Sequence, residues 1–398
     1  MKKTNNLKMI LLLSLLSAFP PLSTDMYLPA LPFLQKTWQQ PMSIMNLTLV
    51  VFFVTYCLSL LVYGPLSDRF GRRPPLLVGI GIYISASLLC AFSGNVFSLI
   101  VFRILQAAGA ASASVIAMAT TKDLYEGHER QRLLAYMGVI MALAPMLAPV
   151  IGAWIMTWFS WPWIFVCQAA IGVFAWGGVL YLEEPLKERS ATGARAIAGM
   201  YLQLLHNKKY LGMVVLFSLI VLPHFSFIGS AADIYINTFG TSEQKFGYFF
   251  AFNALAIMSG SYAFTRLHKI IDSRRLLAIS FVGILLSGML MYSGIVPGPW
   301  GLAVPMAVAS FSFGFSRPPS NNLILEQVKQ SAGTASSFMI FVYFMIGAFS
   351  MWFISLEWTN KIDVISMLAL FSGGIVLTTW LLIAKKAISG KNSTQGVP

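Results

Sequence analysis

The stretch GPLSDRFGRRPP, Gly64 to Pro75, is a short basic loop that separates two long apolar runs. Gly64 and Gly71 allow a tight turn, because glycine accepts backbone angles that other residues avoid. The Asp68 carboxylate can pair with Arg72 and interact with the partial charge of a nearby helix end. Such a loop between apolar runs is typical of the cytoplasmic side of a membrane protein.

The composition of the whole chain indicates a membrane protein. Of its 398 residues, 57% are hydrophobic and only 10% are charged, whereas a soluble chain carries about 25% charged residues. The net charge of +13 does not indicate nucleic-acid binding, because the basic residues form small clusters rather than a long stripe. The three cysteines lie singly in apolar stretches, which argues against a disulfide framework or a metal site.

Apolar segments long enough to cross a bilayer, about 20 residues each, predict twelve spans. They lie near 8–31, 43–64, 75–94, 96–119, 131–156, 161–182, 209–232, 246–265, 276–296, 300–325, 331–354 and 362–384. The basic and then apolar start also resembles a signal peptide. No small-x-small cleavage site precedes Asp25, so we predict an uncleaved first span.

The lysines and arginines outside the spans set the predicted orientation. Nearly all of them fall on the side of the N-terminus, and only Lys36, Lys245 and Lys361 fall on the other side. Basic residues favour the cytoplasmic side, and an even number of spans returns the chain to its starting side. We therefore predict that both termini are cytoplasmic.

A long polar connection divides the spans six and six. We predict a six-helix bundle over 1–182, a cytoplasmic linker over 183–208, and a second bundle with a short tail over 209–398. The basic loops at 63–77 and 262–277 occupy equivalent places in the two halves and indicate an internal repeat. Two repeated halves that bind substrate between them at the membrane midplane are a common transporter architecture.

The loop after span two has a more specific pattern, Gly-x-x-x-Asp-Arg-x-Gly-Arg-Arg. Membrane topology explains its basic residues but not its complete spacing. The loop resembles the signature of the major facilitator superfamily, G-x-x-x-D-R-x-G-R-[RK], which also lies between spans two and three. The resemblance implies an all-α membrane protein with twelve helices in two six-helix bundles around a central cavity. It also implies a cytoplasmic gate motif of Gly64, Asp68, Arg69, Gly71, Arg72 and Arg73.

Two opposite charges lie within the first bundle. In span four, Arg103, Gln106 and Gly109 resemble the R-x-x-Q-x-x-G motif of the superfamily's drug:proton antiporters. At 1.5 Å per residue, Arg103 lies ~10 Å and Asp25 about 9 Å from the outer ends of their spans. Intramembrane charges usually face the bundle interior, so we predict that Asp25 and Arg103 act in proton coupling. They either pair directly or are satisfied separately by a water-filled cavity.

Span five carries a stripe of small residues at Ala144, Ala148 and Gly152, with Pro145 and Pro149 beside it. By spacing alone, the stripe indicates close helix packing, and the prolines predict a bend. Its placement resembles the antiporter signature of the superfamily's exporters, G-x-x-x-G-P-x-x-G. The match is partial, because Ala144 and Ala148 stand where that signature often has glycine.

Three segments, STDMYLPALP, KDLYEG and LAPMLAPVIG, are together similar to the bicyclomycin/chloramphenicol-resistance (Bcr/CflA) branch. The similarity is strong over roughly the first 185 residues and thinner afterwards. Lys122 stands where the branch has arginine, and GSAADIY (Gly229 to Tyr235) lacks the proline expected after serine. The second departure weakens any inference about which compound is carried.

Polar residues in apolar segments are the candidates for a substrate cavity. Asp233 and Asn237 contact substrate or mark only the membrane interface. Arg317 either lines the cavity in a broken, polar part of span ten or reaches the inner interface. The predicted cavity residues are Tyr27, Gln106, Asp233, Asn237, Arg317 and Asn321.

The residues that an enzyme or a metal site would require are absent from the sequence. The sequence has neither a phosphate-binding loop nor metal-spaced histidines, and no nucleophile and base lie on neighbouring spans. A channel or lipid-handling protein stays as the non-transporter alternative, although a channel would not need the pair of intramembrane charges. We therefore expect neither an enzyme nor a cofactor, a metal or a nucleic-acid partner.

The sequence thus predicts a transporter that exports small, mostly apolar compounds in exchange for protons across the bacterial inner membrane, acting as a monomer. Its partners are the substrate, protons and the lipid bilayer. Two alternatives remain on the same fold: an exporter of an endogenous metabolite or siderophore, and a proton-coupled uptake symporter. Fold alone does not separate them, and the antiport direction comes from the resemblance of span five.

Overall fold

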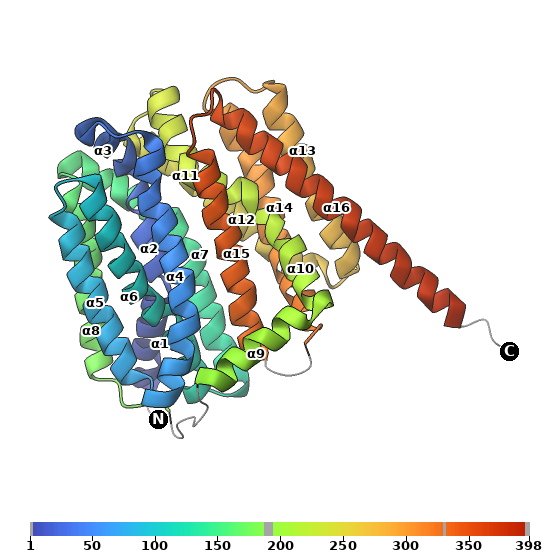
Figure 1. The fold of residues 1–398 in the computed structure, drawn as a ribbon, viewed down its shortest axis with the longest axis horizontal. Coiled ribbons are helices and arrows are strands. Elements are labelled where there is room, and N and C mark those ends of the chain that lie inside the picture. The colour runs from blue at the N-terminus through green and yellow to red at the C-terminus, as the bar shows by residue number, and fades with distance from the viewer. Residues whose placement is uncertain (1–2, 187–193, 329–331, 395–398) are drawn as a thin grey trace.

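The computed structural model describes residues 3–186, 194–328 and 332–394, and the regular structure in these ranges is helical. The first half contains α1 (Lys3–Ser17), α2 (Phe19–Asp25), α3 (Leu31–Trp38), α4 (Met42–Phe70), α5 (Arg73–Ala91), α6 (Val96–Leu124), α7 (Gly127–Trp158) and α8 (Pro162–Leu180). The second half contains α10 (Lys208–Ser218), α11 (Leu222–Ala232), α12 (Glu243–Leu267), α13 (Ser273–Ser293), α14 (Trp300–Leu325), α15 (Ala332–Ile354) and α16 (Lys361–Thr394). Helix α9 (Ala194–His206) lies between the halves (Figure 1).

Most of these helices are long and apolar enough to cross a membrane. Among the described residues, nine segments meet that requirement singly, and a bent pair of helices at the N-terminus makes a tenth. The remaining two predicted spans correspond to α12 and α14, which have spanning length but are less apolar. They pack closely on each other: a Cβ added at Gly260 would lie 2.0 Å from the Phe311 carbonyl oxygen, and one at Gly314 would lie 2.1 Å from that of Ile257.

The first span is not the single helix that we predicted over 8–31. Leu7–Ser17 and Phe19–Trp38 are bent by 45° relative to each other, and a 3-10 turn at Leu28–Ala30 interrupts the second part. Pro20 and Pro21 explain the break, because proline lacks the amide hydrogen that would continue the helix. The bend places Asp25 at the end of α2, one turn before a second interruption.

Two other spans also differ from simple helices. The seventh span runs from α10 through a 3-10 turn at Leu219–Val221 into α11, and ends in a π-helical turn at Asp233–Thr238. The apolar span of α16, Lys361–Ile383, agrees with the predicted span 362–384, but the helix itself continues to Thr394 and projects from the body of the molecule in Figure 1.

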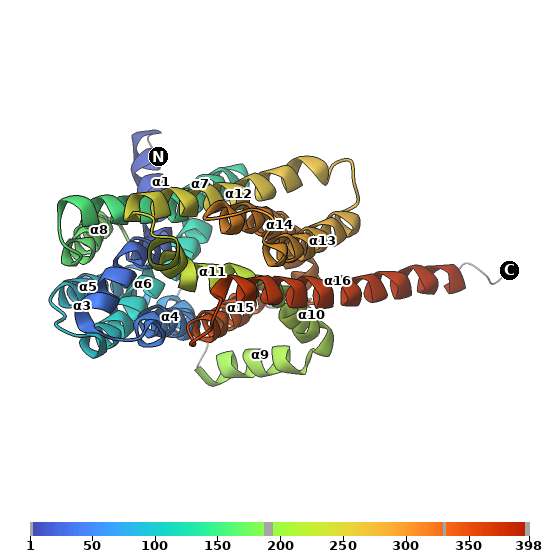
Figure 2. The ribbon, with the colours of Figure 1, turned by 90° about the horizontal axis from the view of Figure 1, so that it is seen from above.

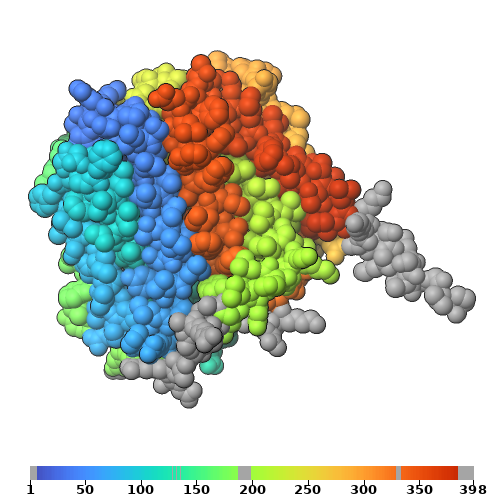
Figure 3. Space-filling model, viewed as in Figure 1, coloured from blue at the N-terminus to red at the C-terminus, as the bar shows by residue number. Residues whose placement is uncertain are grey.

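The two halves pack side by side, with α4 against α15 and α7 against α12 (Figures 1 and 2). Figure 3 shows α4, in blue, lying along α15, in orange-red. We call the end of the molecule that carries the N-terminus and α9 the linker end, and the end that carries α3 the far end. The predicted boundaries at 182 and 209 stay predictions, and the structure ends α8 at Leu180 and begins α10 at Lys208.

Candidate functional site

Arg103 is fully enclosed within the first half of the molecule. Its guanidinium donates hydrogen bonds to the Ser23 carbonyl at 2.9 Å, the Gln106 side chain at 2.7 Å and the Thr48 carbonyl at 3.4 Å. It also lies over the Phe52 ring, 4.4 Å from the centroid. Hydrogen bonds and ring contacts together satisfy most of this buried charge.

Asp25 lies close to Arg103 but does not form an ion pair with it among the described residues. Its carboxylate accepts a hydrogen bond from the Thr24 hydroxyl at 2.8 Å, and the residue is only 6% exposed. The first alternative from the sequence, direct pairing, is therefore absent from this conformation. The bend at Pro20 and Pro21 turns the Ser23 carbonyl, rather than the Asp25 carboxylate, towards the guanidinium.

A network of side-chain amides surrounds Arg103. Gln106 donates to Gln168 of α8 and to Ser87 of α5, each at 2.8 Å, and Gln168 donates to the Ser23 carbonyl at 3.3 Å. The Ser23 carbonyl thus joins the segment before Asp25 to α6 and α8. Our interpretation of the sequence did not single out Gln168, although a glutamine in an apolar span is itself an unusual feature.

Two predicted cavity residues are enclosed by protein in this conformation. Gln106 is fully buried in the amide network, and Tyr27 is fully buried with its hydroxyl 3.3 Å from that of Thr48. Helix packing explains this placement, because both side chains point into the first bundle rather than towards the second. A direct role for either residue in substrate binding stays a prediction.

Close helix contacts hold the segment around Asp25 in place. A Cβ at Gly152 of α7 would lie 2.0 Å from the carbonyl oxygen of Met26, the residue after Asp25. Helices α5 and α6 also pack closely, since a Cβ at Gly109 of α6 would lie 2.5 Å from the Tyr83 amide nitrogen. Helix α7 runs without interruption through Pro145 and Pro149. Gly152 of the small-residue stripe therefore packs on the backbone next to the buried carboxylate, and a role of the stripe as an antiporter motif stays a prediction.

The second half holds another arginine within a helix. Arg317 of α14 is half-buried, and its guanidinium lies 4.0 Å from the centroid of Tyr343 and 5.8 Å from that of Phe313. His224 of α11 stacks on the ring of Phe313, with 4.9 Å between the two ring centroids. Arg317 thus lies among aromatic rings rather than at the end of α14, and a role in lining a substrate cavity stays a prediction.

A continuous series of ring contacts joins Arg103 to Arg317 across the boundary between the halves. Successive ring centroids are 6.0, 5.6 and 5.2 Å apart. The rings belong, in order, to Phe52, Phe53, Phe344 and Tyr343. In this conformation, aromatic side chains therefore occupy the middle of the boundary between the bundles.

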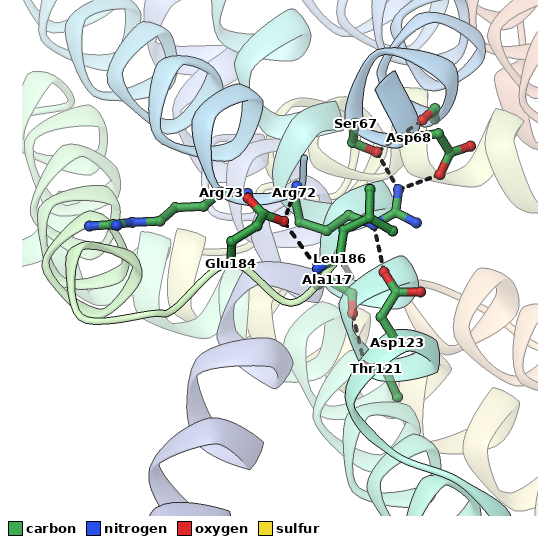
Figure 4. Close-up of polar contacts among 10 residues, drawn as sticks. Ser67, Asp68, Arg72, Arg73, Ala117, Thr121, Asp123, Glu184 and Leu186 are labelled. Atoms are coloured by element: carbon green, nitrogen blue, oxygen red, sulfur yellow. Dashed lines mark hydrogen bonds and ion pairs between the residues drawn. The ribbon is translucent and has the colours of Figure 1, made fainter. Parts of the chain in front are cut away.

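Arg72 organises the loop at the linker end of α4 and α5 (Figure 4). It forms ion pairs with Asp68 at 2.6 Å and with Asp123 of α6 at 2.7 Å, and donates to the Ser67 hydroxyl at 2.7 Å. Burial opposes the charged form of Arg72, but the two carboxylates outweigh it and raise the pKa of the guanidinium. Asp68 remains half-exposed.

Glu184, beyond the end of α8, completes this loop and was not singled out from the sequence. Its carboxylate accepts hydrogen bonds from the amides of Arg72 at 2.6 Å and Arg73 at 3.1 Å, at the start of α5 (Figure 4). A carboxylate is favourable at a helix N-terminus, where amide groups lack partners. Gly71 faces Glu184 with φ +95°, a backbone angle that a side chain would strain.

Only one of the two glycines expected in the turn lies there. Helix α4 continues through Gly64 to Phe70, so Gly64 is a helical residue and Gly71 alone turns the chain. The Ser67 hydroxyl bonds to the Gly64 carbonyl at 2.9 Å. Arg69 is exposed, with its guanidinium 5.4 Å from the Phe70 ring centroid.

Asp233 and Asn237 lie at the far end, away from the two arginines. Asp233 forms an ion pair with Lys361 at 2.6 Å, and Asn237 donates to Asp233 at 2.8 Å and to Gln35 of the first half at 3.1 Å. Asp233, Lys361 and Gln35 help to line an open cavity of about 470 Å³. The sequence does not reveal these partners, because they are distant along the chain, and the proposed substrate contact stays a prediction.

Paired helical halves with buried polar groups midway between their ends are an architecture that many membrane transporters share. The profile of the Major Facilitator Superfamily matches residues 13–351, and the chain therefore belongs to this superfamily. The fold agrees: a D-xylose-proton symporter structure superimposes with a TM-score of 0.73 at 14% identity, over 93% of this chain and 97% of that one. The members of this family are transporters and not enzymes.

Relatives with drug-resistance names align over most of the chain. A bicyclomycin resistance protein homolog from Haemophilus influenzae is 29% identical over 347 residues, covering 85% of this chain and 86% of its own. A chloramphenicol resistance protein from Pseudomonas aeruginosa is 29% identical over 349 residues, covering 85% and 80%. These relatives confirm the resemblance to the bicyclomycin/chloramphenicol-resistance branch.

Proposed function

We propose that the protein is a proton-coupled antiporter that exports small, mostly apolar compounds across the bacterial inner membrane. The observation that carries the proposal is Asp25, a carboxyl group buried in the bent first span beside Arg103. Because it has no ion-pair partner in the described part of the chain, it can take up and release a proton without first breaking a salt bridge. The names of the drug-resistance relatives supply the class of cargo.

The arrangement around Asp25 couples its protonation to helix movement. Gly152 of α7 contacts the Met26 carbonyl, and the same stretch of α7 meets α12 of the other half, where a Cβ at Gly247 would lie 3.2 Å from Val150. A change in charge at Asp25 therefore acts on a backbone that touches the boundary between the bundles. Alternation between two packed arrangements follows from such a contact.

The hydrogen bonds between the two halves support an inward-facing assignment for this conformation. Among the described residues, they are the bonds from Asn46 to the Gly229 carbonyl, Asn237 to Gln35, and Gln244 to Thr157. All three lie towards the far end, which the predicted orientation places outside the cell. Within the described ranges, the residues of the gate motif bond to the first half and not to the second, as expected if the gate is released.

Proton flux in liposomes tests the function. Purified protein is reconstituted with a pH-sensitive dye inside, a proton gradient is imposed, and chloramphenicol or bicyclomycin is added. We expect compound-dependent proton flux that Asp25→Asn abolishes, whereas Glu129→Gln, at an exposed carboxyl group of α7, retains it. Gradient-driven transport by a correctly inserted Asp25→Asn protein would refute the coupling role.

The direction of the flux separates antiport from uptake symport. In antiport, protons and compound move oppositely, and in symport they move together. A second variant tests the gate: we expect Asp68→Asn to slow turnover more than it weakens compound binding. An unchanged turnover rate would count against a gating role for Asp68.

A further inference from the structure

The group formed by Arg317, His224 and Asn321 has polar atoms without protein partners. No carboxylate lies within ion-pair distance of Arg317 among the described residues, and its only recorded contacts there are the Tyr343 and Phe313 rings. Ring contacts stabilise an arginine far less than burial within a membrane span destabilises it. The charge of Arg317 is therefore incompletely compensated by the protein.

Two neighbours of Arg317 also have polar atoms that the described residues do not satisfy. Nδ1 of His224 and Oδ1 of Asn321 are buried without hydrogen-bond partners in the described part of the chain. Asn321 lies four residues after Arg317, on the same face of α14. His224 and Arg317 both contact the Phe313 ring, at 4.9 Å and 5.8 Å from its centroid. Three polar side chains from two helices thus converge without satisfying one another.

Parts of this group are accessible, unlike the surroundings of Arg103. Every side chain of α11 is buried except that of His224, which is partly exposed, and Arg317 is partly exposed as well. Arg103, in contrast, is fully enclosed and has three hydrogen bonds. Arg317 therefore keeps an accessible surface in this conformation, whereas Arg103 is held by protein alone.

The charges of the second half favour an anion over a cation. Its described acidic residues lie near or beyond the ends of helices: Asp233, Glu243, Asp272, Glu326, Glu357 and Asp363. A guanidinium presents two parallel donors that match a carboxylate. The rings of Tyr343 and Phe313, with Phe225 and Phe344 behind them, supply an apolar surface beside it.

We propose that Arg317, His224 and Asn321 form a site for the carboxylate of a small aromatic organic acid, so that the transported compounds include organic anions. Arg317 binds the carboxylate, His224 and Asn321 add hydrogen bonds, and the aromatic body of the ligand packs on Tyr343 and Phe313. The inference rests on the proposed function for the movement of the ligand, but the binding itself requires no proton gradient.

Three ligands of the same shape test the proposal. Isothermal titration calorimetry with the full-length protein in zwitterionic nanodiscs compares 1-naphthoate, neutral 1-naphthamide and cationic 1-naphthylmethylamine. A charge-assisted hydrogen bond corresponds to a roughly ten- to hundredfold preference, so we expect naphthoate to bind at least about tenfold more tightly than either analogue. Equal affinities, a preference for the amine, or no naphthoate binding at millimolar concentration would overturn the proposal.

Variants of Arg317 test whether this side chain causes the preference for naphthoate. Arg317→Gln should reduce the affinity for naphthoate to that for naphthamide, and Arg317→Lys should keep part of the difference. Arg266→Gln is the matched control, because Arg266 also stacks on a tyrosine of its own half but is exposed near the end of α12. A preference for naphthoate that survives Arg317→Gln would contradict the assigned site.

The same titration separates this inference from the proposed function. Asp25→Asn should bind naphthoate normally while losing coupled flux. If the wild type prefers naphthoate but shows no compound-dependent proton flux, the antiporter proposal fails and the binding site stands. If proton flux is coupled to neutral compounds and no charge preference is found, the binding site fails and the antiporter stands. Nanodiscs of anionic lipid provide one more arm, since weaker naphthoate binding there would assign the site to a lipid phosphate and overturn the substrate assignment.

Discussion

Substitution of Gly152 by alanine tests whether the contact between α7 and the segment after Asp25 controls coupling. The new Cβ would lie 2.0 Å from the Met26 carbonyl oxygen, whereas real Cβ contacts essentially never fall below 3.0 Å. The two backbones must therefore separate by about 1 Å, the difference between these two distances. Both contact partners are backbone, so no flexible side chain can absorb the change.

The magnitude follows from this displacement. Overpacking of this kind costs about 1–3 kcal/mol, and the greater helix propensity of alanine offsets about 1 kcal/mol of that loss. A misplacement of about 1 Å near a reacting group can slow a reaction up to about 100-fold. We expect Gly152→Ala to lower the melting temperature moderately. We also expect it to reduce the rate of proton-coupled transport by more than about tenfold and by at most about 100-fold.

Gly138→Ala is the matched control, because Gly138 lies on the same helix with nothing within 4 Å of an added Cβ. It gains the same helix propensity without a contact, so its melting temperature should rise slightly and its transport should not change. Differential scanning fluorimetry in detergent and the liposome flux assay measure both quantities. If Gly152→Ala matched Gly138→Ala in both assays, the reasoning from the contact would be wrong.

Two further predictions concern ion pairs. Asp123→Asn should destabilise the protein by about 1–3 kcal/mol, because it leaves the buried Arg72 with one fewer charged partner. Asp68→Asn should change the stability by less than about 1 kcal/mol, because Asp68 is half-exposed. Equal melting temperatures of the two variants would contradict this ranking. A double-mutant cycle on Asp233 and Lys361 should give a coupling energy of roughly 1 kcal/mol that falls as salt is added. A coupling energy of zero at low salt would show that their 2.6 Å contact does not contribute to stability.

Hydropathy and one loop motif predicted much of this architecture, because both depend on neighbouring residues. The run of apolar residues after Pro41 predicts α4 directly, and the spacing of Asp68 and Arg72 predicts their ion pair. The break in the first span was harder to predict, since membrane helices tolerate proline when neighbouring groups satisfy the freed backbone. Pro20 and Pro21 were visible in the sequence, but the position of the bend was not.

Contacts between distant residues were the part that the sequence did not reveal. Glu184 meets the start of α5 across 112 residues, and Lys361 meets Asp233 across 128. No local pattern encodes such a pairing, because it depends on how helices from different parts of the chain pack. The same reason explains why Arg317 and His224 were not predicted to share the ring of Phe313.

The bonds that join the two halves at the far end are all neutral. Asn46 to Gly229, and Asn237 to Gln35, pair amides with carbonyl oxygens, and no ion pair crosses between the halves among the described residues. Water can replace such bonds one for one when the halves part, and no separated charges have to cross the membrane field. We therefore expect the rate of outward opening to be nearly independent of ionic strength and of membrane voltage, apart from the voltage dependence that the transported proton itself contributes.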